Sequence, residues 1–417
     1  MNIPKILAPA GSFASLRAAL DAGCDAVYFG VGDFNMRATA STNFAEEDLS
    51  EVVKLCREKK VETNITLNTI MYNSDMARMR RMVNLASDAG VSAVIAADMA
   101  TILYAREQGV DVHVSTQVSI SNIETVRFFA QYSDRLVLAR ELTLDQVAEI
   151  VEQIKSEDIR GPKGELIEIE VFAHGALCVS VSGRCGMSLF CANRSANRGK
   201  CTQVCRRKFR VTDTATNQSL DIDNNYVMSS ADLATIGFLP ELVNSGVAVL
   251  KFEGRGRSPE YVDTVISVYR EALDLYKKSQ DQSSYRENIP EWNKRLGTVF
   301  NRGLSKGFYM GRQMDEWARG AGNKATYKKI QIGLVEKYYG EIAVAQVIVH
   351  TDDKPKLGDE LLIIGPTTGL VKHKIVSLQL DGVEVKTAGK GQVVTFKIDK
   401  RVRENDKVYL RVPVKQV

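Results

Sequence analysis

The feature that most constrains the fold is a repeated alternation of short apolar segments with amphipathic segments along the first two thirds of the chain. Most of the apolar segments are continuously apolar or rich in β-branched residues, as buried parallel strands are. We predict eight strands, at Ile6–Pro9, Ala26–Gly30, Thr63–Asn68, Ala93–Asp98, Asp111–Thr116, Arg135–Arg140, Glu168–Ala173 and Ala248–Glu253. The segments between them have helical periodicity. One predicted helix begins with Ser74 as N-cap and ends at Gly90, and another begins at Ser258 and Pro259.

This alternation predicts an α/β fold, a TIM-like (β/α)8 barrel over residues 1–282. That length is close to the roughly 250 residues typical of such barrels. A doubly wound open sheet is the alternative. In a barrel the functional site lies at the carboxyl ends of the strands. Polar or conformationally permissive residues occur at these predicted ends, namely Gly11, Gly30, Asn68, Asp98, Ser115, Gln117, Arg140, Glu141, His174, Glu253 and Arg255.

The pattern changes after the eighth predicted strand. We expect residues 283–325, which are polar and aromatic, to form a linker with one helix and a Gly-rich turn. Over residues 326–417, short strand-like segments are separated by turn signals such as Asp381-Gly382. This pattern predicts a small antiparallel β-barrel, a fold that binds RNA or protein in some chains and is purely structural in others.

Composition narrows the class of protein. Hydrophobic residues are 44% and charged residues 25% of the 417 residues, which excludes a disordered or collagen-like chain. No apolar segment reaches the length of a membrane span, and the first residues lack a secretory signal pattern. We therefore expect a cytoplasmic protein that has no membrane partner.

The net charge of +4 is unevenly distributed. Residues 176–210 hold eight Lys or Arg and no Asp or Glu, and residues 324–417 hold 17 basic against 11 acidic residues. Two basic regions on an otherwise acidic body indicate a polyanionic partner such as nucleic acid, although a solvated surface would have the same composition. In the first region we expect Arg206, Arg207, Lys208 and Arg210 to contact phosphates.

Cysteine spacing gives the strongest chemical signal. Five of the seven cysteines lie in the insertion at residues 176–210, as Cys178, Cys185, Cys191, Cys201 and Cys205. Thiolates that converge on one loop hold zinc or an iron–sulfur cluster. Only Cys201 and Cys205 have the close spacing of a zinc knuckle, so an iron–sulfur cluster is favoured over zinc, over disulfides and over unrelated buried thiols. Cys24 and Cys56 lie among apolar residues and are expected in the core.

The segments EVFAHGALCVSVSGRC and GKCTQVCRR resemble the signature of the U32 peptidase family, which is also described as collagenase-like. The opening LAPAGSFASLRAALDAGCDAVYFGV and the segments KFEGRGRSPEYV and FNRGLSKGFYMGR resemble further blocks of that family, in the same order. The resemblance implies that Cys178, Cys185, Cys201 and Cys205 hold a [4Fe-4S] cluster. It offers no counterpart for Cys191.

Members of the family hydroxylate a tRNA wobble uridine, a ribosomal RNA cytidine or a ubiquinone precursor, and the family name rests on a protease assignment. The CTQVCRR segment and the single C-terminal domain are most similar to the branch that forms 5-hydroxyuridine in tRNA. The resemblance therefore implies tRNA as partner, prephenate as cofactor and an electron donor that the sequence does not identify. Hydroxylation of a ribosomal RNA or a quinone precursor, peptidase activity and a non-catalytic RNA-binding module are the alternatives.

Candidate catalytic residues are His174, Arg140 and Glu253, with His174 as a proton donor. We expect Arg255 and Arg257, together with Arg140, to hold the carboxylates of prephenate, because arginine forks suit carboxylates. Each of these side chains could instead have a structural role, in ion pairs for the arginines and in a buried hydrogen bond for His174. A peptidase is disfavoured because the sequence has no HExxH, and Cys178 with His174 is the only local Cys–His pair.

Overall fold

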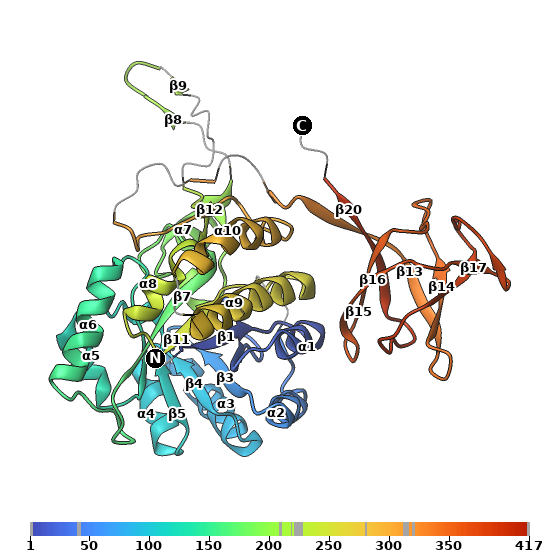
Figure 1. The fold of residues 1–417 in the computed structure, drawn as a ribbon. Coiled ribbons are helices and arrows are strands. Elements are labelled where there is room, and N and C mark those ends of the chain that lie inside the picture. Colours follow the sequence, from blue (N-terminus) through green and yellow to red (C-terminus); the bar gives the residue numbers. More distant parts are fainter. Residues whose placement is uncertain are drawn as a thin grey trace.

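The computed structural model describes residues 3–39, 43–207, 211–217, 219–220, 228–279, 282–311, 317–318 and 322–414. Its N-terminal part is a closed parallel barrel surrounded by helices (Figure 1). Neighbouring strands follow chain order, and β11 closes the barrel by pairing with both β1 and β7. The eight barrel strands are β1 (Lys5–Pro9), β2 (Ala26–Phe29), β3 (Glu62–Leu67), β4 (Ala93–Ala96), β5 (Asp111–Val114), β6 (Arg135–Val137), β7 (Glu168–Ala176) and β11 (Val249–Phe252). The predicted barrel is confirmed, and the open-sheet alternative is wrong.

Helices cover the outside of the barrel: α1 (Phe13–Asp21), α2 (Leu49–Glu58), α3 (Met76–Ala89), α4 (Met99–Glu107), α5 (Ile123–Ala130), α6 (Leu144–Ser156), α8 (Leu239–Asn244) and α9 (Pro259–Ser279). Helix α9 begins at Pro259 and α3 ends at a left-handed Gly90, as predicted. The prediction of Ser74 as the N-cap of α3 is wrong. A 3-10 turn, η1 (Asn73–Asp75), precedes α3, because the Asp75 carboxylate accepts the Tyr72 N–H and pairs with Arg198.

The long segment between β7 and β11 holds the insertion and extends the sheet. It contains α7 (Met187–Ala192), the turns η3 (Ala196–Arg198) and η4 (Val204–Arg206), and a hairpin of β8 (Val211–Thr212) and β9 (Ser219–Leu220). It then forms β10 (Asp232–Ala234), which pairs antiparallel with β7, and η5 (Ile236–Phe238). Another short turn, η2 (Thr116–Val118), follows β5. The insertion therefore begins at the carboxyl end of β7, and its last strand, β10, returns to lie beside that same end.

Residues 283–325, expected as a linker, contribute to the barrel domain. Helix α10 (Gln282–Leu296) buries Tyr285 and Trp292 in the same core as the barrel strands, and the Trp292 indole N–H donates to Glu271 of α9 at 3.0 Å. Strand β12 (Leu304–Ser305) pairs with β10. The core of the barrel domain thus continues past the predicted boundary at residue 282.

The C-terminal domain, predicted as a small antiparallel β-barrel, is one antiparallel sheet of eight strands around its own core. Its strands are β13 (Tyr327–Tyr339), β14 (Val344–Val349), β15 (Glu360–Gly365), β16 (Gly369–Lys374), β17 (Gln379–Leu380), β18 (Val383–Glu384), β19 (Val393–Lys397) and β20 (Lys407–Pro413). In Figure 1 this domain lies beside α1. Ala18 of α1 packs against Leu362 and Leu370, and Lys329 pairs with Glu260 of α9 at 2.8 Å.

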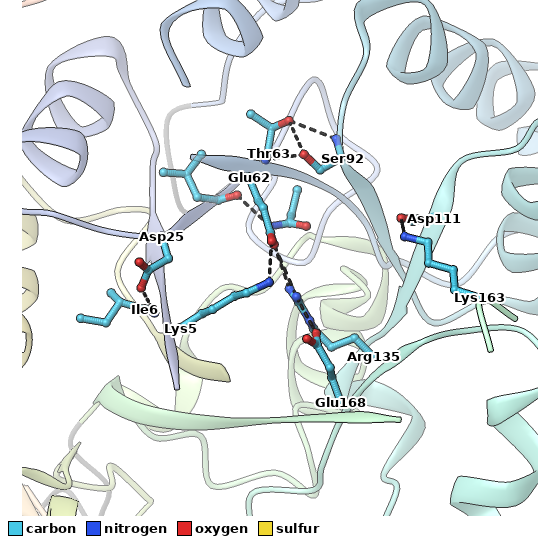
Figure 2. A network of polar contacts seen from close by, with 12 residues as sticks. Lys5, Ile6, Asp25, Glu62, Thr63, Ser92, Asp111, Arg135, Lys163 and Glu168 are labelled. Atoms are coloured by element: carbon cyan, nitrogen blue, oxygen red, sulfur yellow. Dashed lines mark hydrogen bonds and ion pairs between the residues drawn. The ribbon is translucent and has the colours of Figure 1, made fainter. Parts of the chain in front are cut away.

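Charged side chains close the amino end of the barrel (Figure 2). The first residues of β1, β3, β6 and β7 are Lys5, Glu62, Arg135 and Glu168. Lys5 pairs with Glu62 at 2.6 Å, and Arg135 pairs with Glu168 at 2.6 Å. This end of a barrel contributes to stability, so the site is sought at the opposite end. Of the described helices, none combines the length and apolar character needed to cross a membrane.

The burial of Trp292 predicts the effect of truncating it. Trp292→Ala should lower the free energy of unfolding by about 3–5 kcal/mol, because a large fully buried side chain leaves a cavity. The control is Phe190→Ala, since Phe190 is 89% exposed, and it should change stability by less than about 0.5 kcal/mol. Urea unfolding measures both. Equal, small effects would show that α10 is a linker outside the core.

Candidate active site

Three of the predicted cysteine ligands line one cavity at the carboxyl end of the barrel. The cavity has a volume of about 120 Å³, and its wall includes Cys178, Cys201 and Cys205. Cys185 lies within electrostatic range of Cys205. All seven cysteines of the chain are described and all are free thiols. The charged side chains in the same wall are Arg37, Arg206, Glu253, Arg257 and Arg302.

Local backbone geometry brings these thiols to the barrel. Gly175, near the end of β7, has a φ of +111°, and a Cβ there would collide with the Glu253 carbonyl. Glycine therefore lets β7 and the segment after β11 approach closely. The Arg206 guanidinium donates to the carbonyls of Leu177 at 2.6 Å and Ser230 at 2.7 Å. These bonds tie the turn that carries Cys205 to the residue beside Cys178.

The thiols and their surroundings influence one another electrostatically. Burial raises the pKa of the Cys205 thiol, Arg206 lowers it, and the neighbouring Cys178, Cys201 and Cys185 raise it further. Ionised thiolates that lie close together therefore repel one another, unless a positively charged group lies near them. Elsewhere in the insertion Cys191 is exposed on α7. Cys24 and Cys56 are buried core residues, as predicted.

Glu253 is the centre of a cluster of arginines. Its carboxylate accepts from Arg37 at 2.9 Å. Burial alone would raise the pKa of Glu253, but Arg37, Arg257, Arg140 and Arg255 together lower it to about 2. In turn, Glu253 raises the pKa of Arg37. Glu253 is therefore ionised at neutral pH and balances part of the charge of the arginines.

The three arginines predicted to bind carboxylates occupy different positions. Arg257 lines the cavity and lies 3.5 Å from the ring centroid of Phe300. Arg255 is buried, donates to the Thr66 hydroxyl at 2.8 Å, and has a pKa lowered by burial to about 10. Arg140 stacks 3.7 Å from the Phe172 ring centroid, and its Nε atom is buried without a hydrogen-bond partner among the described residues. Neither Arg255 nor Arg140 is part of the cavity wall.

His174 is buried, is not part of the cavity wall, and lies against the rings of Tyr261 and Tyr269. Its Nδ1 atom is 3.4 Å from the Tyr269 hydroxyl, and its ring centroid is 6.2 Å from that of Tyr261. Burial lowers the pKa of His174 to about 3. The imidazole is therefore neutral at physiological pH, which suits a buried hydrogen-bonding role better than donation of a proton to a substrate.

The four residues predicted to bind RNA differ in their surroundings. Arg206 is committed to internal hydrogen bonds, whereas Arg207 is exposed. Lys208 and Arg210 lie outside the described residues. Two cavity residues, Arg37 and Arg302, were not predicted. Arg302 lies within the segment FNRGLSKGFYMGR that carries the family resemblance, whereas no local pattern marks Arg37, which follows β2 by eight residues.

The burial of His174 predicts a pH dependence. Its pKa is lower in the folded protein than the ordinary value of 6.5, so protons favour the unfolded chain below that pH. Wild-type stability should fall by about 1.4 kcal/mol per pH unit, relative to His174→Gln, as the pH drops below about 6.5. Thermal unfolding across this pH range measures the difference. A variant that follows the wild-type curve would show that His174 titrates normally.

Comparison with known proteins identifies the relatives of the chain. Peptidase family U32 matches residues 11–319. A protein of Porphyromonas gingivalis named Collagenase is 45% identical, over 98% of both chains. The Bacillus subtilis tRNA hydroxylation protein P1 is 33% identical, over 96% of this chain and 93% of that protein. The Escherichia coli 23S rRNA 5-hydroxycytidine C2501 synthase is 30% identical, over 91% of this chain and 54% of that protein. The chain therefore belongs to peptidase family U32.

Proposed function

We propose that this protein is an RNA-modifying hydroxylase that forms 5-hydroxyuridine at the wobble position of tRNA. In this proposal Cys178, Cys185, Cys201 and Cys205 hold a [4Fe-4S] cluster, and prephenate binds beside it. The observation that carries the proposal is the convergence of three of these thiols with four arginines in one cavity at the functional end of the barrel. Relatives named for tRNA and ribosomal RNA hydroxylation support the choice of substrate class.

The donor chemistry of these residues suits an iron–sulfur cluster, because cysteine thiolates are the usual ligands of such clusters. Three of the four proposed ligands line one cavity, and the fourth, Cys185, influences Cys205 electrostatically. Four cavity arginines offset the negative charge of thiolates. When bound, the cluster supplies electron transfer that does not require O2.

The cavity arginines suit a small dicarboxylate. Arg37, Arg206, Arg257 and Arg302 outnumber the single carboxylate of Glu253 in the wall. Arg206 is tied to backbone carbonyls, and Arg302 pairs with Asp232 at 3.1 Å. Arg257, which stacks on Phe300, is the best candidate to donate to a ligand carboxylate. Glu253 orients Arg37, and it accepts rather than donates hydrogen bonds at neutral pH because it is ionised.

The surface of the insertion suits a polyanion. Arg184, Arg194, Lys200 and Arg207 are exposed, and residues 176–210 contain no acidic side chain. Phosphates that replace counterions on such a surface make affinity fall with salt. The looped bases of an anticodon can leave their stack at little cost and so can enter a site at the mouth of a barrel.

Peptidase activity is the second candidate, because the relative at 45% identity is named Collagenase. A cysteine peptidase needs a histidine beside its nucleophile. Within the described residues, however, the Cys178 sulfur contacts the Ser180 hydroxyl at 2.9 Å, and His174 contacts Tyr269. Cys178 and His174 therefore contact other side chains, which disfavours this sequence-local pair as the nucleophile and base of a cysteine peptidase.

The test is the nucleoside composition of tRNA, measured by mass spectrometry, from cells that lack this gene. Wild type and Cys191→Ala should restore 5-hydroxyuridine or its derivatives, because Cys191 is exposed and outside the cavity wall. Cys178→Ala should restore less than about one hundredth of the wild-type level, since losing a ligand abolishes the site. Full restoration by Cys178→Ala would contradict the proposal, as would a tRNA profile that does not depend on the gene.

A further inference from the structure

A second cavity lies at the carboxyl ends of β3, β4 and β5, underneath the insertion. Its volume of about 320 Å³ is within the roughly 300–1,000 Å³ of small-molecule sites. Barrel residues Asn68, Thr69, Asp98 and Gln117 line it, and Asn197 and Arg184 of the insertion complete it. These barrel residues occupy the edge where barrel enzymes bind substrates.

This cavity adjoins the thiol cavity through two segments. Met36 lines the second cavity, and the next residue, Arg37, lines the first. The Cys185 N–H donates to the Asn197 side-chain oxygen at 3.2 Å. A molecule held in the second cavity would therefore be next to the proposed cluster without occupying the anion cavity.

Amide groups give the second cavity hydrogen-bond donors. The Gln117 Oε1 atom accepts from Asn68 Nδ2 at 3.2 Å and from the Ser115 hydroxyl. Both of these hydrogen bonds use the oxygen of Gln117, so among the described residues its NH2 group remains available to donate to a ligand. The Asn197 oxygen is likewise used by Cys185, which leaves the Asn197 NH2 group as a second donor.

Acceptors lie in the same wall. The Asp98 carboxylate accepts from the backbone N–H groups of Ala100 at 3.0 Å and Met71 at 2.9 Å, one on each oxygen. Each oxygen therefore keeps a lone pair for another donor. Thr69 is 2% exposed, and its hydroxyl oxygen is buried with no partner in the described part of the chain. An unmatched hydroxyl is costly to bury, which indicates a partner that binds there.

We propose that this cavity holds the target base and that it reads uracil. The inference rests on the proposed function and names the site where the substrate base binds. The pairing edge of uracil presents carbonyl, N–H and carbonyl groups in turn. Amide donors from Gln117 and Asn197, with the Asp98 carboxylate as acceptor, complement that edge. Cytosine presents an amino group in place of one carbonyl and would leave a donor of the site unmatched.

The remaining wall suits a flat neutral ring. Met36 and Met99 provide apolar surface for the faces of a base. Arg184 is the one basic side chain in the wall, and Asp98 offsets its charge, so a dicarboxylate is better matched by the neighbouring thiol cavity. Because Arg184 is exposed, it can contact a phosphate of the same nucleotide.

The test compares two anticodon stem-loop RNAs that differ only in carrying uridine or cytidine at the wobble position. Binding to the anaerobically purified holoprotein is measured by fluorescence anisotropy at fixed salt. Wild type should bind the uridine loop about tenfold more tightly. In Gln117→Glu a carboxylate replaces the donor, so the preference should fall below about twofold or reverse toward cytidine, whose amino group it can accept. The control Gln108→Glu makes the same change at an exposed position and should match wild type.

A second variant, Thr69→Val, distinguishes a role of this hydroxyl in base binding from an effect on stability alone. Thr69→Val keeps the shape but removes the unpartnered hydroxyl, so it should raise the melting temperature and weaken the uridine preference. A higher melting temperature with an unchanged preference would contradict a role for Thr69 in the site. Equal binding of both loops by wild type would overturn the uracil pocket and leave RNA hydroxylation standing. Absence of salt-dependent binding to either loop would overturn both.

Discussion

The structure at the carboxyl end of the barrel depends on one buried carboxylate surrounded by arginines. Glu253 brings together Arg37 from the segment after β2, Arg140 from the segment after β6, and Arg257 from the segment after β11. Without a negative charge these guanidinium groups would repel one another where water cannot screen them. The Glu253 backbone N–H also donates to the His174 carbonyl at 2.8 Å. That contact fixes the end of β11 against β7, whose continuation carries Cys178.

This arrangement gives the two cavities different chemical characters. The thiol cavity collects positive charge, because four arginines share its wall with Glu253. The second cavity is lined mainly by amides, a carboxylate and methionines. Under the two proposals, the anionic ligand and the base would occupy separate cavities, with the chain at Met36 and Arg37 between them. The insertion links both cavities, since it supplies the thiols of one and Asn197 of the other.

The sequence was sufficient for the barrel, because eight buried parallel strands must be nearly continuous apolar segments. Cysteine spacing alone also indicated a shared site. Long-range contacts were not predictable in this way. Ser74 lies in the turn before α3 rather than at its N-cap, and the Asp75 carboxylate next to it pairs with Arg198, over a hundred residues away. Arg206 was predicted to contact phosphates at the surface, yet its guanidinium donates to the Leu177 carbonyl and so holds the turn with Cys205 near Leu177. Arg37 could not be recognised, because an ion pair across 216 residues leaves no local pattern.

One experiment with the purified protein can test tRNA hydroxylation and peptidase activity side by side. Purified protein, kept free of oxygen, is incubated with prephenate and tRNA that lacks 5-hydroxyuridine, with and without a chemical reductant, and in parallel with gelatin. Nucleosides and peptides are then measured by mass spectrometry. The proposed hydroxylase should form 5-hydroxyuridine in the tRNA, should lose this activity when iron is removed, and should leave gelatin intact. Cleaved gelatin with unmodified tRNA would contradict the proposal.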